Sequence, residues 1–460
     1  MTGIPWHDRF ELQRAEMRRV TRFQPDPLLR LDEEDLETAI LRLENEHRRL
    51  FVPTEQLLDV LEAMVGLARA HSRSVYGDNR SFGTGCHSRT PPLPDAGPLI
   101  CLTGLAGVGK SSLLGAIQRA LNGSSRSVAD VPGLGQFAMV SAWELLIGER
   151  RSHAAVLAEL HDHAVDLDYR ARGIAEERRA PIDAPKSVPA LVEACRRRAY
   201  RDGVALMLVD EFQFLTRSAN ANTLVTSLLL HLRSLGVPVV YGANFSLGHR
   251  LLRRNQEDLD RVFERSPMVL KPELPDSPDW RQTVEGFVAL SPKIFDLDAA
   301  TSAEIIHHFC GGLKRYLGRL IRLAYRRARL DKRRVSIATL EAAFRSHDYA
   351  IPRREIAEIA RITLGVQSKR LDLVCPFEVP ASEVASERAR ATQKQVERTM
   401  EMFAHEQLTE RERRILGELR VSAGNQGKKG RAEVRSIKQR ATLPSVSALR
   451  EAEERRRRRD

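Results

Sequence analysis

The sequence predicts an α/β fold built around a parallel sheet, and two observations support this prediction. First, short apolar runs alternate with segments of helical periodicity between Leu99 and Leu274. Strands that are apolar along their whole length are typical of a parallel sheet covered by helices on both faces. Second, a glycine-rich loop at residues 104–111 lies between the first apolar run and a helical segment. Many parallel α/β folds begin with such a unit of strand, loop and helix.

Five apolar runs are expected to form the strands of this sheet. They are Leu99–Thr103, Gln136–Ser141, Ala205–Asp210, Pro238–Tyr241 and Met268–Leu274. Pro238 cannot donate a backbone hydrogen bond, but a strand tolerates proline at its first residue. A helix from Asn222 to Leu235, ended by Gly236, is expected to separate the third strand from the fourth.

The regions that flank this core are expected to be mostly helical. Helical periodicity follows the acidic run that ends at Asp35, and a second helix is predicted from Pro53 to Arg73. The stretch from Gly77 to Pro98 is rich in Gly, Ser and Pro and is predicted to be a linker or exposed loop. We therefore divide the chain into a helical N-terminal extension with linker (1–95), an α/β core (96–290), a helical lid (291–350) and a charged C-terminal region (351–460).

In the predicted lid, Thr301 and Glu304 have the spacing of a capping box at the start of a helix. Further helices are expected from Leu313 to Ala328 and from Ser336 onward, and a charged helical stretch over 387–419. Residues 424–460 are basic and poor in large apolar side chains, so we expect this tail to be largely disordered in isolation. The tail ends with arginines at 455–459. The sequence leaves open whether these arginines contact DNA, a partner protein or nothing.

Composition restricts the possible functions. The chain of 460 residues carries 73 Lys and Arg against 61 Asp and Glu, a net charge of +12, which favours a polyanionic partner such as nucleic acid. The five cysteines lie far apart without a Cys-x-x-Cys pair, so neither a zinc site nor a disulfide framework is indicated. No segment approaches the ~20 apolar residues that a membrane span needs. With no apolar signal core at the N-terminus, a cytoplasmic location fits best.

The glycine-rich loop has the spacing of a phosphate-binding loop. Its residues are Gly104, Leu105, Ala106, Gly107, Val108, Gly109, Lys110 and Ser111, followed by Ser112. Glycines allow the backbone amides to turn toward phosphates, while Lys110 is expected to reach the β- and γ-phosphates and Ser111 to ligate Mg²⁺. The helix that starts near Lys110 adds the positive end of its dipole. We expect these residues to bind ATP with Mg²⁺.

A second motif is the apolar strand that ends in Asp210-Glu211. We expect Asp210 to hold the Mg²⁺ shell through water and Glu211 to polarise the water that attacks the γ-phosphate. Asn244 follows the next predicted strand. If that strand lies between the other two, Asn244 points into the gap beside the γ-phosphate and positions the attacking water; the alternative is a simple turn asparagine.

Several arginines complete the candidate site. Four precede the last predicted strand: Arg253, Arg254, Arg261 and Arg265. In ring-forming ATPases an arginine here reaches the neighbouring subunit's γ-phosphate and stabilises the charge of the transition state. We favour Arg261, then Arg265. After Gly311-Gly312, the start of a lid helix offers Arg315, with Arg319 as the alternative, for contact with the phosphates of the same subunit.

A strand, a phosphate loop, an Asp-Glu pair, a polar sensor, an arginine and a helical lid in this order resemble the AAA+ ATPases. That resemblance implies a five-stranded parallel sheet in the order 5-1-4-3-2.

The likeness is more specific around the Asp-Glu pair. Residues 203–218, GVALMLVDEFQFLTRS, resemble the VIDEIQHLSRS segment of TnsC, in the TnsC/TniB family of transposon-encoded ATPases. Residues 235–240 are similar to that family's GVPV strand, and residues 51–54 and 76–80 resemble its segment ahead of the phosphate loop. Asp279-Trp280 also matches the family. The chain departs from it where Gly242-Ala243-Asn244 replaces the usual Gly-Thr-Pro. The resemblance covers residues 20–350.

The resemblance implies a regulator of DNA transposition. Such a protein binds ATP, assembles into rings or filaments on double-stranded target DNA, and links a target selector of the TniQ or TnsD type to the transposase subunits. ATP hydrolysis then disassembles the homo-oligomer. Lysines and arginines that follow the phosphates would give salt-dependent, sequence-independent binding, and Arg150 and Arg151 are candidates for a central pore.

Three alternatives stay open. A helicase loader is also an AAA+ protein on DNA, but it is normally shorter and lacks the segment at 51–80. A nucleotide-switched signalling protein of the defence class would need a repeat or effector domain, which the sequence does not show. An adaptor with negligible turnover would not need Glu211 or an arginine finger.

Overall fold

The computed structural model describes residues 10–77, 79–123, 127–131, 135–147, 152–171, 185–210, 221–363 and 366–377. Four of the expected features lie outside the described residues. They are Glu211, the Arg150-Arg151 pair, the charged stretch at 387–419 and the basic tail at 424–460. Within the described residues, no helix is both long and apolar enough to cross a membrane.

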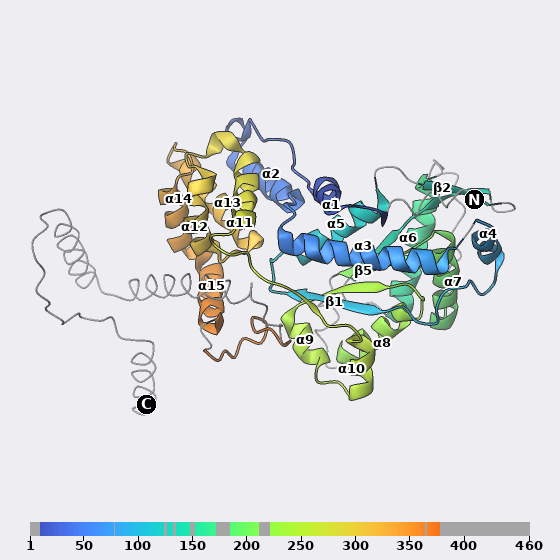
Figure 1. Cartoon of the computed structure of the whole chain (residues 1–460). Coiled ribbons are helices and arrows are strands. Elements are labelled where there is room, and N and C mark those ends of the chain that lie inside the picture. Colours follow the sequence, from blue (N-terminus) through green and yellow to red (C-terminus); the bar gives the residue numbers. More distant parts are fainter. Residues whose placement is uncertain are drawn as a thin grey trace, which may run out of the picture. The chain divides into compact units, whose positions relative to one another are not determined.

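A central sheet of five parallel strands confirms the predicted fold class (Figure 1). Its strands are β1 (Leu99–Gly104), β4 (Ala142–Leu146), β5 (Leu206–Asp210), β6 (Val239–Ala243) and β7 (Met268–Leu270). The spatial order is β4-β5-β6-β1-β7, which is the expected 5-1-4-3-2 order seen from the other edge. Strands β1, β5 and β6 are buried along their whole length, as their apolar sequences predict.

The prediction of Gln136–Ser141 as the second strand of the sheet is wrong. Residues Gly135–Met139 form β3, which pairs antiparallel with β2 (Ser127–Val131) in a separate two-stranded ribbon. The sheet takes β4 instead, which pairs parallel with β5. The chain is apolar on both sides of Ser141, so apolar character alone does not show where one strand ends. Asn122 marks the break, because its side chain exchanges hydrogen bonds with the backbone of Ala142 at 2.9 and 3.1 Å.

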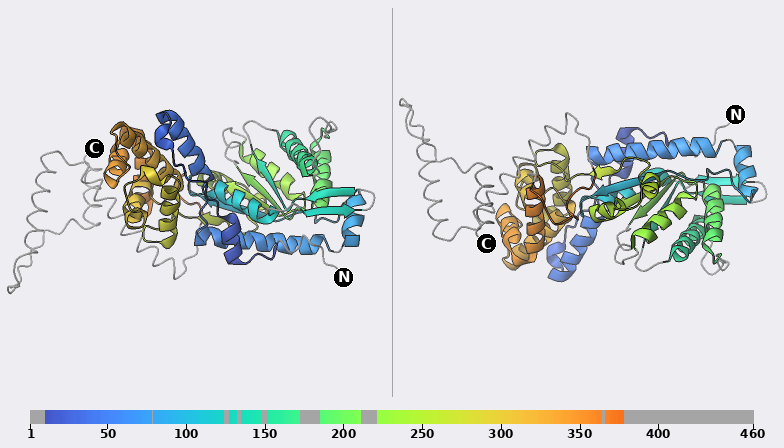
Figure 2. Two further views of the ribbon diagram at one scale, coloured as in Figure 1. Left: turned by 90° about the horizontal axis from the view of Figure 1, so that it is seen from above. Right: turned by 90° about the horizontal axis from the view of Figure 1, so that it is seen from below.

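Helices lie on both sides of the sheet (Figure 2). Those of the core are α5 (Lys110–Asn122), α6 (His153–Ala171), α7 (Val188–Arg201), α8 (Ala221–Arg233), α9 (Phe245–Leu251) and α10 (Gln256–Val262). Helix α5 contacts β1, β4 and β5 directly. It therefore carries the loop at its N-terminus to the carboxyl edge of the sheet, where ligands bind in open α/β folds.

Among the described residues, the N-terminal region contains the α-helices α1 (Arg14–Thr21), α2 (Leu36–Arg49), α3 (Glu55–Val75) and α4 (Asn79–His87). Helix α2 begins where expected, because the Asp35 carboxylate accepts hydrogen bonds from the backbone amides of Glu37 and Thr38. Helix α4 corrects the prediction of a loop from Gly77 to Pro98. It packs on α7 through Gly85, where a Cβ would lie 2.3 Å from the Tyr200 hydroxyl, so this glycine serves close packing of two helices.

After β7 the chain forms α11 (Pro278–Ala289), α12 (Ala299–Cys310), α13 (Lys314–Leu330), α14 (Ile337–Arg345) and α15 (Ala350–Thr363). Of these, α12, α13 and α14 lie within the expected lid. The capping box expected at Thr301 is wrong. Asp298 caps α12 and accepts from the amides of Ala300 and Thr301, because a carboxylate three residues earlier gives the chain a stronger acceptor. A capping box is present at α14, between Ser336 and Thr339.

After α15 the chain returns to the α/β core, where residues 366–377 lie against α9 (Figure 1). The His249 ring nitrogen Nε2 lies 2.9 Å from the Val374 carbonyl oxygen, and the Phe377 ring meets the Phe263 ring edge-on at a centroid distance of 5.2 Å. This segment, which we call the return segment, therefore ties the end of the lid to the helices that follow β6.

Gly248 should be essential for this docking. A Cβ there would lie 2.8 Å from Cγ of Pro376 and 3.1 Å from Cε2 of Phe377. We expect Gly248→Val to destabilise the protein by about 1–3 kcal/mol, because an overpacked contact must open. Chemical denaturation measures the loss, and limited proteolysis shows whether the return segment becomes accessible.

Gly66→Ala in α3 is the matched control, because a Cβ there meets no atom within 4 Å. It should stabilise the chain by about 0.5–1 kcal/mol through helix propensity. Equal stability of Gly248→Val and the wild type would show that the return segment contributes nothing to folding.

Candidate nucleotide-binding site

The phosphate loop connects the end of β1 to the start of α5. Gly104, Gly107 and Gly109 have φ angles of +153°, +87° and +115°, which side chains with a Cβ rarely adopt. Gly107 also allows the lid to approach, since a Cβ there would lie 2.6 Å from Cβ of Arg315. The loop therefore has the conformation that a phosphate cradle needs, and the first turn of α13 lies directly on it.

Lys110 is the first residue of α5 and is buried, with 9% of its surface exposed. Its ammonium group donates hydrogen bonds to the carbonyl oxygens of Gly104 and Leu105, at 2.8 and 3.0 Å. The charge is therefore held inside the loop, where a phosphate oxygen would be within reach.

Asp210 and Asn244 lie together at the carboxyl edge of neighbouring strands, as the sequence predicts. Strand β6 lies between β1 and β5, so Asn244, directly after β6, stands between the phosphate loop and Asp210. A Cβ at Gly242 would lie 2.8 Å from Oδ1 of Asp210, so this glycine makes room for the carboxylate. Asn244 is the N-cap of α9, yet its side chain makes no capping hydrogen bond.

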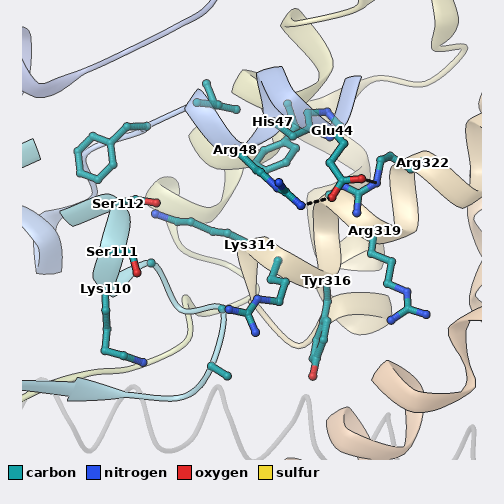
Figure 3. Close-up of a pocket in the computed structure, with 18 of the residues that line it drawn as sticks. Glu44, His47, Arg48, Lys110, Ser111, Ser112, Lys314, Tyr316, Arg319 and Arg322 are labelled. Carbon is teal, nitrogen blue, oxygen red and sulfur yellow. Dashed lines mark hydrogen bonds and ion pairs between the residues drawn. The ribbon is translucent and has the colours of Figure 1, made fainter. Parts of the chain in front are cut away.

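A cavity of about 740 Å³ connects these groups, a size typical of sites for small organic ligands (Figure 3). From the core it is lined by the phosphate loop, Asp210 and Asn244. From elsewhere in the chain it is lined by α2 and the residues after it, by Phe287 of α11 and by α13. The side chains from these other helices are Glu44, His47, Arg48, Leu50, Phe51, Phe287, Lys314, Arg315, Tyr316, Arg319 and Arg322.

The charge of the cavity is mainly positive. Its cationic residues are Arg48, Lys110, Lys314, Arg315, Arg319 and Arg322, and its carboxylates are Glu44 and Asp210. Glu44 already pairs with two of the arginines, at 2.5 Å with Arg48 and 3.7 Å with Arg322. The remaining excess of cations suits a triphosphate.

The lid distinguishes between the two arginines proposed for phosphate contact. Arg315 starts α13 beside the phosphate loop, and its backbone amide donates to the Gly107 carbonyl oxygen at 3.4 Å. The Arg319 guanidinium donates to the carbonyl oxygen of Asp348, at 2.6 Å. Lys314 is a second cation at the loop, and burial lowers the pKa of its ammonium group. The geometry therefore favours Arg315 over Arg319 and adds Lys314.

The arginines proposed to act on another subunit lie away from this cavity. Arg261 is exposed in α10, and Arg265 is exposed in the loop before β7. In the part of the chain that the structure describes, neither guanidinium has an ion pair, whereas Arg254 pairs with Asp258 at 2.7 Å. Arg254 thus has a structural partner, and Arg261 and Arg265 stay available at the surface.

The residues present fit ATP with Mg²⁺. Ser111 and Asp210 both line the cavity and offer oxygen ligands. Mg²⁺ is usually held by one or two protein oxygens together with phosphate oxygens and water. The described residues contain no cluster of three or more His, Cys, Asp or Glu that could hold a metal by itself.

The sequence did not predict the contribution of α2. His47, Arg48 and Phe51 looked like parts of an amphipathic helix and its connection. Two cations lie over the Phe51 ring, with Arg119 Cζ at 5.7 Å and Lys314 Nζ at 5.9 Å from its centroid. The only local signal was the run at 51–54, which the family resemblance included.

Comparisons with known proteins identify an AAA domain in the α/β core. Residues 95–251 match the family model described as AAA domain. Similar solved structures include domain III of the replication initiation protein DnaA from Thermotoga maritima, with 14% identity, covering 64% of this chain and 92% of that chain, at a TM-score of 0.35. The Aeropyrum pernix ORC1 protein in complex with DNA has 17% identity, covering 70% and 82%, at a TM-score of 0.35. No curated protein matches the chain.

The strand order, the phosphate loop between β1 and α5, and the match of residues 95–251 to an AAA domain identify the α/β core as an AAA-type ATPase domain. The five-stranded sheet lies at the centre of this domain, and the candidate nucleotide site is the cavity between the phosphate loop and α13.

Proposed function

We propose that this AAA+ ATPase is an ATP-dependent regulator of DNA transposition that oligomerises on target DNA. The observation that carries the proposal is the division of the site: one set of residues lines the cavity, while Arg261 and Arg265 are exposed and do not line it. A transition state that needs an arginine from another copy makes turnover depend on assembly. The likeness of residues 203–218 to TnsC supports the transposition role.

Within one subunit, the phosphate loop holds the triphosphate and Lys110 neutralises charge on its β- and γ-phosphates. Bound Mg²⁺ would supply further charge stabilisation, with Ser111 and Asp210 as its protein ligands. Asn244 positions the attacking water and Glu211 polarises it. Arg261 of an adjacent copy, with Arg265 as the alternative, then stabilises the charge that develops as the γ-phosphate leaves.

In this proposal the protein is assembled on double-stranded DNA while ATP is bound and dissociates after hydrolysis. The net charge of +12 supports contact with DNA phosphates. The ATP-bound oligomer links a selector of the TniQ or TnsD type to the transposase, and hydrolysis releases the oligomer. A gene for a DDE-type transposase beside a TniQ-like gene would support these partners, and a replicative helicase gene in that place would contradict them.

Glu211→Gln tests the switch. The amide keeps the size of the side chain but cannot act as a base, so we expect ATP binding to persist and turnover to fall by about a hundredfold or more. ATP-dependent sedimentation with double-stranded DNA should show the variant retained long after the wild type has dissociated.

The exposed Glu285→Gln in α11 is the matched control, with the same substitution away from the cavity. It should behave as the wild type. A Glu211→Gln protein that binds ATP but forms neither oligomers nor DNA complexes would rule out the proposed function.

A further inference from the structure

Residues 261–265, which we call the finger segment, begin in the last turn of α10 and carry both arginines proposed to act on an adjacent copy. Helix α10 has only seven residues, and a helix this short is marginal without tertiary contacts. The last carbonyl oxygens of a helix also have no partner inside it. In α10, two of these oxygens accept hydrogen bonds from side chains of other elements. Those elements therefore determine the direction in which Arg261 leaves the core.

Arg233, in the last turn of α8, makes the first of these contacts. Its Nη1 donates to the carbonyl oxygen of Arg261 at 3.1 Å, and its Nη2 lies 3.0 Å from Oε2 of Glu264. The Arg233 side chain is only 22% exposed, so solvent screens this ion pair less than a pair on the open surface. One planar guanidinium thus holds both the end of α10 and the turn that follows it.

Two aromatic contacts hold the residues between these points. The hydroxyl of Tyr241, a buried residue of β6, donates to the carbonyl oxygen of Val262 at 3.3 Å. The ring of Phe263, the next residue, packs against Phe377 of the return segment. The sheet and the return segment therefore support the middle of the finger segment, whereas Arg233 holds the backbone of Arg261 itself.

Arg233 also occupies the acidic residue of the finger segment. Glu264 lies three residues after Arg261 and directly before Arg265. If it were unpaired, this carboxylate would be free to pair with either arginine and to neutralise the charge that the transition state needs. In the described part of the chain, Glu264 pairs with Arg233, and neither Arg261 nor Arg265 has an ion pair.

We propose that Arg233 is a positioning residue, which directs Arg261 toward the γ-phosphate on the adjacent copy and keeps Glu264 away from it. The inference rests on the proposed role of Arg261 and deepens it. Arg233 does not line the cavity, so its effect on hydrolysis must pass through the finger segment. A displacement of about 1 Å in a catalytic group can cost about a hundredfold in rate.

Arg233→Met tests the role, because methionine keeps an apolar stem and removes both polar contacts. We expect ATP turnover to fall by about tenfold or more, since Arg261 loses its fixed direction. ATP affinity should stay within about twofold of the wild type, because the cavity is unchanged. Arg233→Lys keeps a cation for Glu264 and should recover part of the lost turnover. Steady-state phosphate release and calorimetric titration give these values.

Mixing experiments separate positioning from a general loss of structure. In a mixture of Arg233→Met with Glu211→Gln, intact sites of the first variant meet well-placed arginines of the second, if contacts run head to tail. Turnover should then rise above the mean of the two separate proteins. A mixture of Arg233→Met with Arg261→Ala offers no well-placed arginine and should show no such rise. An Arg233→Met subunit damaged in its own site would gain from neither partner.

Arg196→Met is the matched control. Arg196 of α7 is also a half-buried arginine that holds backbone carbonyl oxygens, those of Ser234 at 2.7 Å and Pro94 at 2.9 Å. Its hydrogen bonds do not involve the finger segment. The substitution should therefore leave turnover and ATP affinity unchanged.

The outcomes distinguish the positioning role from the proposed function. Full turnover in Arg233→Met while Arg261→Ala is inactive would overturn the positioning role, and so would the absence of any gain with Glu211→Gln. Full turnover in Arg261→Ala would instead refute the proposed use of that arginine between copies. Should Arg233→Met not fold, Arg233→Gln stays polar, loses the ion pair with Glu264 and carries the same comparison.

Discussion

Replacing Lys110 with alanine should abolish ATP binding at micromolar concentrations, with a loss of affinity of at least about a hundredfold. The buried ammonium group is held within the phosphate loop by two carbonyl oxygens. A charge-assisted hydrogen bond contributes about 1.5–3 kcal/mol, and Lys110 would make such bonds to the phosphates. Removing it also leaves the positive end of α5 as the main attraction within the loop.

Thermal unfolding with increasing ATP measures this effect, because a ligand that binds only the folded state raises the melting temperature with its concentration. The wild type should show that increase and Lys110→Ala should not. Lys293→Ala, at an exposed lysine outside the cavity, is the control and should respond as the wild type does. An undiminished increase in Lys110→Ala would show that the nucleotide does not bind at the phosphate loop.

The central sheet could be predicted because the apolar pattern of each of these strands lies within its own short stretch of sequence. Strands β1, β5 and β6 are short, apolar throughout and separated by helices, so each is recognisable from its own residues. The order of the strands was predicted from the resemblance of the motifs to those of AAA+ ATPases. That order places Asn244 beside Asp210, although the two residues are far apart in the sequence. The same local reasoning failed at 136–146, where one apolar stretch supplies two strands to two different sheets.

The far half of the cavity could not be predicted, because it depends on tertiary contacts. His47 and Arg48 face the site only because α2 packs against α13, and nothing in the sequence of α2 distinguishes that surface from an ordinary buried stripe. The return segment is similar. The docking of its apolar residues could not be predicted, because the residues that they contact, Gly248 and Phe263, lie more than a hundred residues earlier in the chain.

Arg261→Ala should lower ATP turnover by about a thousandfold, the effect typical of an arginine that stabilises transition-state charge from a neighbour. Its affinity for ATP should be unchanged, because Arg261 is exposed in α10 and does not line the cavity of its own subunit. Steady-state phosphate release and calorimetry give the two values. Arg281→Ala, at an exposed arginine of α11 outside the cavity, is the control, and Arg265→Ala tests the alternative finger.

Mixing two inactive variants decides whether Arg261 acts on another copy. An Arg261→Ala subunit keeps its own phosphate loop, Asp210 and Glu211, whereas a Glu211→Gln subunit keeps Arg261 but cannot activate water. In a random equal mixture, about one interface in four joins an intact site to an intact arginine when contacts run head to tail. Turnover should therefore rise on mixing to about a quarter of the wild-type value if each interface works independently. Recovery must come from two chains, since neither variant contains a complete site. If the mixture stays inactive although both variants bind ATP and assemble together, Arg261 does not supply the missing charge in trans, and the same mixture with Arg265→Ala then examines the remaining candidate.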